Sequence, residues 1–520
     1  MKENFLVIDM GTQSLRASVV SRKGEILAMA SRHYDAPYFS PKKGFCEQNP
    51  DYYIEQLAIA NKELIKKNPE IYETIMGLVF ISFRDTAILL DEDKKPLRPI
   101  ILWLDQRTAK IPGMNNLKLH EKIIFRLLGM TDTVKYNSQR TISFWIKENE
   151  PDIWNRMKHY VPLTAYYNYL MTGRLVVSTA DCIGHYPINF KKGKWYSKIH
   201  PKVNVFGIPL EALPELVKPG EIIGFINEEF SKRTGIPVGL PLYASGSDKS
   251  CETLGDGVID KTTGSISLGT ACSIDVVDDK YKEPEAFLPS YPTPYLGSYD
   301  LEVQVYRGLW MISWFASQFG LEDEKKAAEE HVSLENYLNR KIAEIPAGCD
   351  GLVLQPYWGP GLKRPNAKGS IIGFSGVHTR FYFYRAMIEG IGFALREGLD
   401  EIVKKTKTMP KYLVISGGGS ASDVFLQIMA DIFNLPVYRP EIKEAATLGA
   451  AISGYLGAGI YASAKEATKN MFRLGQRFQP DTERAKIYDR LYKEVYLLIY
   501  PSLKKAYKNS KDFFLDTNHE

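Results

Sequence analysis

Two stretches of the chain share one pattern, in which a short apolar run ends at a polar turn and a second strand-like run follows. The first is FLVIDMGTQSLRASVV, residues 5–20, and the second is TGSISLGTACSIDVV, residues 263–277. Short runs of alternating polarity that are joined by a glycine-containing turn are typical of β-hairpins. We therefore expect two similar hairpins in two similar halves that face one cleft.

The pattern outside the hairpins predicts alternating helices and strands. Residues 25–30 extend the first hairpin by a third strand, and residues 76–91 read as two strands with a polar interruption. Trp310 and Trp314, four residues apart, predict an apolar stripe that faces the core. Helices are expected over residues 51–67, 139–155, 160–172, 384–404 and 444–459. The last of these is rich in small residues and can pack closely on its neighbours.

Length and composition describe a globular protein of more than one domain. The chain has 520 residues, which exceeds what one core usually serves, so two domains of roughly 250 residues are expected. Apolar residues make up 44%, charged residues 24%, and the net charge is +5, so charge calls for no nucleic-acid partner. Five cysteines without CxxC spacing argue against a disulfide framework or a structural zinc site. We expect a cytoplasmic protein without a signal peptide or membrane span.

The turn of the first hairpin carries polar groups suited to an anion. Asp9 ends the apolar run with a carboxylate, and Gly11 permits a tight turn. The hydroxyls, amide and N–H groups that follow come from Thr12, Gln13 and Ser14. Alone, this stretch favours an ordinary hairpin in which Asp9 caps the turn. The repeated turn at Gly269 and Thr270 shifts the interpretation toward two turns that hold phosphates.

Two further stretches carry candidate chemistry. Asp248 follows a strand of small residues and opens a helix, where it is either a simple N-cap or a general base for an attacking hydroxyl. Lys249 beside it is an exposed charge or a phosphate contact. Residues 412–434 read as a strand, three glycines (residues 417–419) and a helix, and such a turn lets the backbone approach a nucleotide. It is neither a Walker loop nor a GxGxxG fingerprint.

Candidate sugar ligands follow two apolar runs of the first half. Arg84 and Asp85 form either a self-satisfied ion pair or a pair that binds adjacent hydroxyls of a polyol. Trp103 alone is a core residue by preference. Together with Asp105 and Arg107 it becomes the kind of set that binds sugars, because sugar C–H faces stack on rings while hydroxyls take donors and acceptors.

The order of these motifs resembles the FGGY carbohydrate kinases, which share the fold of actin, hexokinase and heat-shock chaperones. The segments that carry the resemblance are DMGTQSLR, SFRDTAILLD, ILWLDQR, SGSDKSCETLG, GSISLGTACS, GSIIGFSGVHTRFYFYRAMIEG, SGGGSASDVFLQIMADIFNLPV and EAATLGAA. The resemblance implies an α/β fold of two actin-like, ribonuclease H-like domains with an ATP and substrate cleft between them. It places an N-terminal domain at residues 1–244, a C-terminal domain at 245–465 and a helical extension at 466–520.

The resemblance also implies roles for particular residues. Asp248 matches the catalytic base, and Asp9 would position the Mg²⁺ of ATP through water. ATP is expected at Thr12, Gln13, Ser14, Gly269, Thr270, Gly418, Gly419 and Ser422. The sugar or polyol is expected at Arg84, Asp85, Trp103, Asp105 and Asp248.

Departures from the family pattern leave the substrate open. Lys249 stands where most members carry Gln or Asn, Ile142 where a Lys is common, and Tyr382 at an acidic or amide position. The Arg84–Asp85 pair resembles glycerol kinases more than xylulokinases. We expect an ATP-dependent kinase of a pentulose, xylulose-like or glycerol-like acceptor. The alternatives are a non-kinase ATPase of the same fold and a catalytically silent sugar sensor. A homodimer is one candidate assembly.

Overall fold

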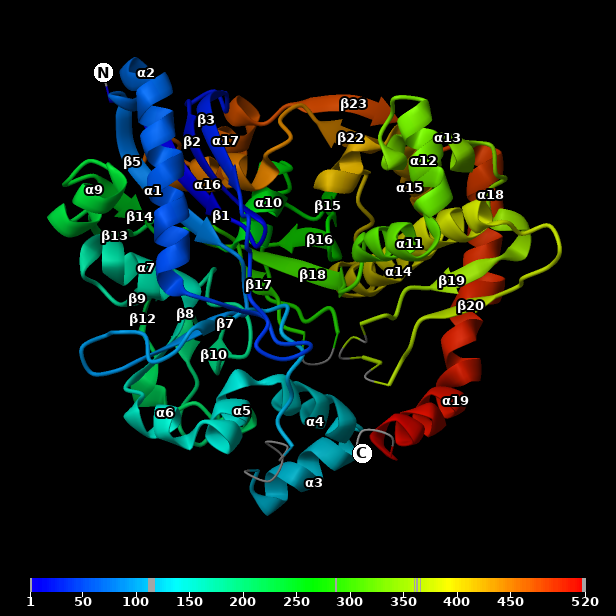
Figure 1. Ribbon diagram of the computed structural model, residues 1–520, viewed down its shortest axis with the longest axis horizontal. Coiled ribbons are helices and arrows are strands. Elements are labelled where there is room, and N and C mark those ends of the chain that lie inside the picture. The colour runs from blue at the N-terminus through cyan, green and yellow to red at the C-terminus, as the bar shows by residue number, and fades with distance from the viewer. Residues whose placement is uncertain are drawn as a thin grey trace.

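The computed structural model describes residues 2–110, 117–285, 288–359, 361, 363–364 and 366–516. Figure 1 shows two twisted sheets side by side, the first on the left and the second to its right, with helices around both. Each sheet has its own apolar core. The two-domain α/β organisation expected from the sequence is therefore present.

The first sheet is built around the first hairpin and runs in the order β13-β14-β5-β1-β2-β3. β1 pairs antiparallel with β2 and parallel with β5, and β2 pairs antiparallel with β3. These pairings confirm the predicted hairpin and its third strand. The strands are β1 (Asn4–Met10), β2 (Ser14–Val20), β3 (Ile26–His33), β5 (Ile75–Ser82), β13 (Ile222–Phe225) and β14 (Pro241–Tyr243).

The second sheet repeats this arrangement, in the order β17-β18-β16-β15-β21-β22-β23. The hairpin β15–β16 corresponds to β1–β2, because β18 lies antiparallel beside β16 and β21 lies parallel beside β15. An antiparallel edge pair closes both sheets, β13–β14 in the first and β22–β23 in the second. The two similar halves predicted from the repeated pattern are thus confirmed. The strands are β15 (Thr263–Leu268), β16 (Cys272–Asp278), β17 (Tyr291–Pro292), β18 (Tyr299–Val305), β21 (Tyr412–Ser416), β22 (Val437–Pro440) and β23 (Leu474–Phe478).

Helices cover the sheets and smaller strands extend the first half. α1 (Pro50–Lys67) packs on β2 and β3, and α14 (Arg380–Thr406) packs on β16 and β18. The other elements before residue 244 are β4 (Glu47–Gln48), α2 (Pro69–Tyr72), β6 (Ala87–Leu90), β7 (Ile100–Ile101), α3 (Leu119–Leu127), α4 (Thr131–Arg140), α5 (Ile142–Asn149), α6 (Pro151–Arg156), β8 (His159–Pro162), α7 (Leu163–Thr172), β9 (Val176–Ser178), β10 (Ile188–Asn189), β11 (Lys194–Trp195), α8 (Pro201–Phe206), β12 (Glu215–Val217) and α9 (Glu228–Thr234). After it come α10 (Asp248–Gly255), α11 (Trp310–Phe319), α12 (Leu321–Glu329), α13 (Leu334–Ala343), β19 (Val353–Gln355), β20 (Ser370–Ile372), α15 (Asp423–Phe433), α16 (Ala445–Gly457), α17 (Ala464–Met471), α18 (Thr482–Leu491) and α19 (Leu497–Asp516).

Two helix predictions in the first half were wrong. Residues 159–162 form strand β8, which pairs with β6, and helix α7 begins only after Pro162. Residues 139–155 do not form one helix, because α4 ends at Arg140, α5 begins after Thr141, and Pro151 opens α6 at its first position. A proline sets one boundary in each of the two stretches.

Trp310 and Trp314 are half-buried and pack against the second core, as expected, while the fully buried face of α11 is formed by Met311 and Phe315. One expectation in the second half needs correction. The segment expected as a helical extension, residues 466–520, also contributes the edge strand β23 to the second sheet. Its last four residues, 517–520, lie outside the described residues.

α10 and α16 pack against each other between the two sheets. A Cβ atom built on Gly449 of α16 would stand 1.8 Å from the carbonyl oxygen of Cys251, and one on Gly255 of α10 would stand 1.8 Å from that of Ala445. Only glycine permits this approach. The close packing predicted for residues 444–459 is therefore confirmed, and it fixes the helix that begins at Asp248.

Replacing Gly449 by alanine should destabilise the protein by about 2–3 kcal/mol, because the added methyl group has to push the two helices apart. The thermal midpoint of unfolding measures this loss. Gly376→Ala is the control, since a Cβ at Gly376 meets no atom within 4 Å. Equal midpoints for the two variants would contradict the close helix contact.

Candidate active site

The turn after β1 is tight and carries a buried acid. The N–H of Gly11 donates to the carbonyl oxygen of Ser14 (2.9 Å), which closes the turn, so Asp9 is not its cap. Asp9 lies across the ladder from Arg16, with Oδ2 3.6 Å from the guanidinium Nη1. Burial raises the pKa of Asp9 to about 6, with Arg16 lowering it and Asp248 raising it. A buried acid thus stands at the mouth of the first turn.

The first turn is tied to the candidate sugar site by Trp103. The indole Nε1–H of Trp103 donates to Thr12 Oγ1 at 2.9 Å. Gln13 is exposed, and Ser14 begins β2 in a half-buried position. Two of the predicted sites, the phosphate turn and the aromatic sugar contact, are therefore in direct contact.

The second turn, between β15 and β16, is anchored to helix α11. The backbone N–H groups of Leu309 and Trp310 donate to the carbonyl oxygens of Gly269 (3.0 Å) and Thr270 (3.3 Å). Thr270 is exposed. This turn carries no acid corresponding to Asp9, so the two hairpins share a backbone shape but differ in charge.

The glycine turn after β21 adopts the predicted strand-to-helix geometry. Gly417 has a φ of 81°, and a Cβ there would stand 2.7 Å from the carbonyl oxygen of Leu268. By contrast, a Cβ on Gly418 would meet nothing within 4 Å, so this face of the turn is open. Ser422 caps α15, its Oγ accepting the N–H of Phe425 (3.3 Å).

Asp248 occupies the first position of α10, where it lies half-buried. The N-cap is Ser247, whose Oγ accepts the N–H of Ser250, so Asp248 is not the cap. Its Oδ1 accepts the N–H of Lys249 at 2.8 Å, and among the described residues no hydrogen bond reaches Oδ2. Burial raises the pKa of Asp248, while Arg84 and Lys249 partly offset the rise. One oxygen is thus available to accept a proton.

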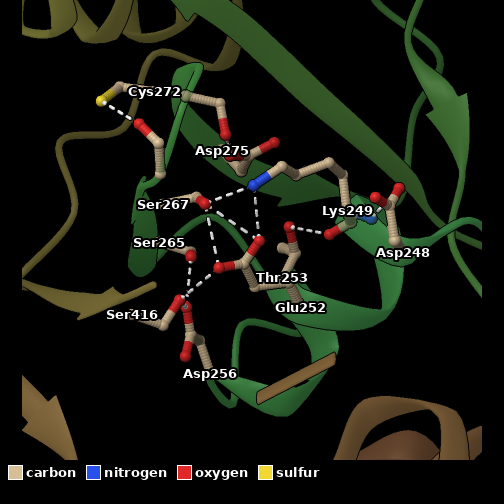
Figure 2. Close-up of polar contacts among 12 residues, drawn as sticks. Asp248, Lys249, Glu252, Thr253, Asp256, Ser265, Ser267, Cys272, Asp275 and Ser416 are labelled. Atoms are coloured by element: carbon tan, nitrogen blue, oxygen red, sulfur yellow. Dashed lines mark hydrogen bonds and ion pairs between the residues drawn. The ribbon is translucent and has the colours of Figure 1, made fainter. Parts of the chain in front are cut away.

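The side chain of Lys249 points into the second half, away from solvent. Its Nζ donates to Glu252 Oε2 (2.7 Å) and to Ser267 Oγ (Figure 2). Glu252 in turn accepts from Ser267 and Ser416 at 2.9 Å, which joins α10 to β15 and β21. Asp256 accepts from Ser416 and Ser265 in the same network. Lys249 is therefore not a simple exposed charge, and its contact with a phosphate stays a prediction.

Arg84 and Asp85 do not pair with each other. Arg84 makes a two-pronged ion pair with Glu302 of β18, Nη1 to Oε2 at 2.6 Å and Nη2 to Oε1 at 2.7 Å. Asp85 Oδ1 accepts the backbone N–H of His185 and lies 2.8 Å from its Nδ1. The interpretation of a self-satisfied pair was therefore wrong, because each partner comes from a distant segment.

Asp105 is held by its neighbours. Arg107 donates to it from the backbone N–H, Nε and Nη2 at 2.7–2.8 Å, and the N–H of Cys46 donates at 2.7 Å. Among the described residues, the carboxylate of Asp105 accepts hydrogen bonds from Arg107 and Cys46 and not from Arg84. Its direct contact with a sugar stays a prediction.

Asp181, which the sequence reading missed, lies close to Asp248. The carbonyl of the preceding Ala180 accepts the N–H of Ser247, which links this loop to the start of α10. The pKa of Asp181 is raised to about 8, mainly by burial and also by the nearby Asp248, while a hydrogen bond with Thr164 opposes the rise. Two carboxyl groups therefore share this region.

Asp181 should make stability fall as the pH rises. From its ordinary 3.8 to about 8, the folded state keeps a proton that the unfolded state has lost, so unfolding becomes easier through this window. Asparagine does not titrate, so Asp181→Asn should remove this part of the fall in stability with rising pH. The drop in thermal midpoint between about pH 5 and about pH 8 should shrink by about 2 °C or more in the variant. An equal drop in both proteins would contradict the raised pKa.

Glu302 was also missed, although the sequence holds a signal for it. Asp300, Glu302 and Gln304 alternate along β18, and Asp275 lies opposite Glu302 on β16. Alternate polar residues in a buried strand form a polar inner face, and this is unusual enough to mark a site.

Among the described residues, no helix is long and apolar enough to cross a bilayer, and no group of three or more His, Cys, Asp or Glu side chains is arranged to hold a metal ion.

Two halves with the same strand order define the class of proteins with two actin-like domains. The chain belongs to the FGGY family of carbohydrate kinases: the family's N-terminal domain matches residues 4–255 and its C-terminal domain residues 264–458. It is therefore a kinase that transfers phosphate to an alcohol group. The first family domain ends at residue 255 and the second begins at residue 264, and the division at residue 244 stays a prediction.

Similar proteins span the whole chain. A xylulose kinase of Lactococcus lactis is 28% identical over 515 residues, covering 98% of this chain and 97% of that protein. The structure of a xylulose kinase from Rhodospirillum rubrum has a TM-score of 0.82 at 25% identity, covering 97% of this chain and 100% of that one. A gluconate kinase from Lactobacillus acidophilus has the same fold, with a TM-score of 0.82 at 23% identity, covering 98% and 99%.

Proposed function

We propose that the protein phosphorylates a hydroxyl of a small ketose or polyol with ATP, and that Asp248 is the general base. The observation that carries this proposal is the position of Asp248, at the start of a helix that the glycine contact fixes, with one carboxylate oxygen available. Asp248 takes the proton of the acceptor hydroxyl, whose oxygen then attacks the γ-phosphorus while ADP leaves.

The two hairpin turns and the glycine turn would hold ATP. Backbone N–H groups and hydroxyls of the turns suit the phosphates, and the open face at Gly418 suits the adenosine. The donor set at Asp9 fits Mg²⁺, because a buried carboxylate with a raised pKa is stabilised by a divalent cation. Bound Mg²⁺ would supply positive charge that offsets the charge of the phosphates.

The acceptor would lie beside Arg84, Asp85 and Trp103. Arg84 keeps N–H donors beyond the two that Glu302 uses, and these suit sugar hydroxyls. Trp103 presents a half-buried ring next to the first turn. The xylulose kinases among the similar proteins favour a pentulose over glycerol.

The test is a panel of acceptors. Purified protein with ATP and Mg²⁺ is assayed for ADP release with pentuloses, hexuloses, alditols, glycerol and sugar acids, each against a control without acceptor. We expect a clear preference for one neutral acceptor. Equal ADP release with and without every acceptor would instead support a non-kinase ATPase, and sugar binding without turnover would support a silent sensor.

A further inference from the structure

The Arg84–Glu302 ion pair joins the two halves of the molecule. Arg84 follows β5 of the first sheet, and Glu302 lies on β18 of the second, 218 residues away in the chain. The side chain of Arg84 is 12% exposed and that of Glu302 is 4% exposed. Each carboxylate oxygen of Glu302 accepts a hydrogen bond from the guanidinium of Arg84. Gln304 donates to the same carboxylate. The pair is thus a built feature of the candidate sugar site.

The surroundings of this pair carry further negative charge. Arg84 is attracted by Asp248 as well as by Glu302, and its guanidinium lies 5.8 Å from the ring centroid of Tyr291. Asp85, adjacent in the chain, is bound to His185. Burial by itself lowers the pKa of Arg84, but Glu302 and the smaller contributions of Asp248 and Tyr291 together raise it by more. Arg84 therefore keeps its positive charge, which the carboxylate of Glu302 balances. An entering anion therefore finds the charge of Arg84 already balanced by Glu302.

We propose that Glu302 is a specificity-determining residue of the sugar site, which confines the acceptor to uncharged sugars and polyols and excludes sugar acids. This inference rests on the proposed function and adds a substrate class to it.

The physical reason is competition for one guanidinium. A sugar carboxylate could bind Arg84 with both of its oxygens only by displacing Glu302. The sugar carboxylate and the buried carboxylate of Glu302 would then lie side by side and repel each other. A neutral hydroxyl can instead use the N–H groups that Glu302 leaves, without any like-charge contact. Glu302 therefore acts by repulsion of the wrong substrate as much as by orientation of Arg84.

The experiment compares kcat/KM for the best neutral acceptor of the panel and for the sugar acid with the same number of carbon atoms. Wild type should prefer the neutral acceptor, and Glu302→Gln should lower this preference by about 10-fold or more, because Arg84 then carries an uncompensated charge. A merely structural role would reduce kcat/KM for both acceptors alike and leave their ratio unchanged.

Glu397→Gln is the matched control. Glu397 makes a partly buried, two-pronged pair with Arg364 in the second half, so the same chemical change there should leave the ratio of the two kcat/KM values within about twofold. Circular dichroism and thermal midpoints establish that each variant is folded.

Two results would overturn the proposal: a wild type that prefers the sugar acid, or a folded Glu302→Gln variant with the wild-type ratio. If the Glu302→Gln variant does not fold, the sugar acid is tested as a competitive inhibitor of the wild-type reaction with the neutral acceptor. A Ki near the KM of the neutral acceptor would also overturn the proposal. Absence of turnover with every acceptor would reject the proposed function itself. This result differs from the two above, in which the protein phosphorylates an acceptor but Glu302 does not determine which one.

Discussion

Asp248→Asn is expected to lower kcat by about 10³-fold or more while leaving ATP affinity within about threefold of wild type. Asparagine keeps the size of the side chain and can still accept the N–H of Lys249, so α10 should begin as before. What it lacks is the oxygen that takes the proton of the acceptor. Steady-state ADP release measures kcat, and titration calorimetry measures ATP binding.

The control for this variant is Asp51→Asn. Asp51 also lies in the first turn of a helix, but it is exposed on α1 and pairs with Arg233. Its replacement should change kcat by less than about twofold. Near-normal turnover in Asp248→Asn would remove Asp248 from the role of base, whatever the acceptor.

Asp9→Asn should weaken Mg²⁺-dependent activity by about 10- to 100-fold, as expected for a carboxylate that holds a metal through water. The same substitution removes a buried charge whose pKa is raised to about 6, so the fold should be retained or become slightly more stable near neutral pH. Loss of activity without loss of stability separates a metal role from a structural one.

The measurement is ADP release as a function of Mg²⁺ concentration at saturating ATP. We expect the half-saturating Mg²⁺ concentration to rise in Asp9→Asn and to stay constant in Asp51→Asn. An unchanged Mg²⁺ dependence in Asp9→Asn would show that the carboxylate does not hold the metal.

The parts of the site that the sequence could predict are local in the chain. Asp9 and the first turn lie within one hairpin, and the glycines at 417–419 stand between a strand and the helix that follows it. Such motifs bring their own geometry, because turn residues and apolar periodicity act over a few positions. This is why both hairpins and the start of α10 were placed correctly.

The missed contacts join residues that are far apart in sequence. Arg84 meets Glu302 across 218 positions, and Asp85 meets His185 across 100. Lys249 is a local exception, since its partner Glu252 is only three residues away, but Ser416 completes the network from another strand. Partner choice at such distances follows from how the sheets and the segments that connect their strands pack together, which no short window of the sequence encodes.

The helix pair α10–α16 has a consequence for how the family can be recombined. α16 belongs to the second half by sequence, yet Leu448 and Ile452 share a core with Phe5, Val7 and Val79 of the first sheet. A fragment ending near residue 260 would lose the part of this core that α16 supplies. Chimeras between family members should therefore exchange α16 together with the first sheet, since a crossover at the midpoint of the chain would join surfaces that did not evolve together.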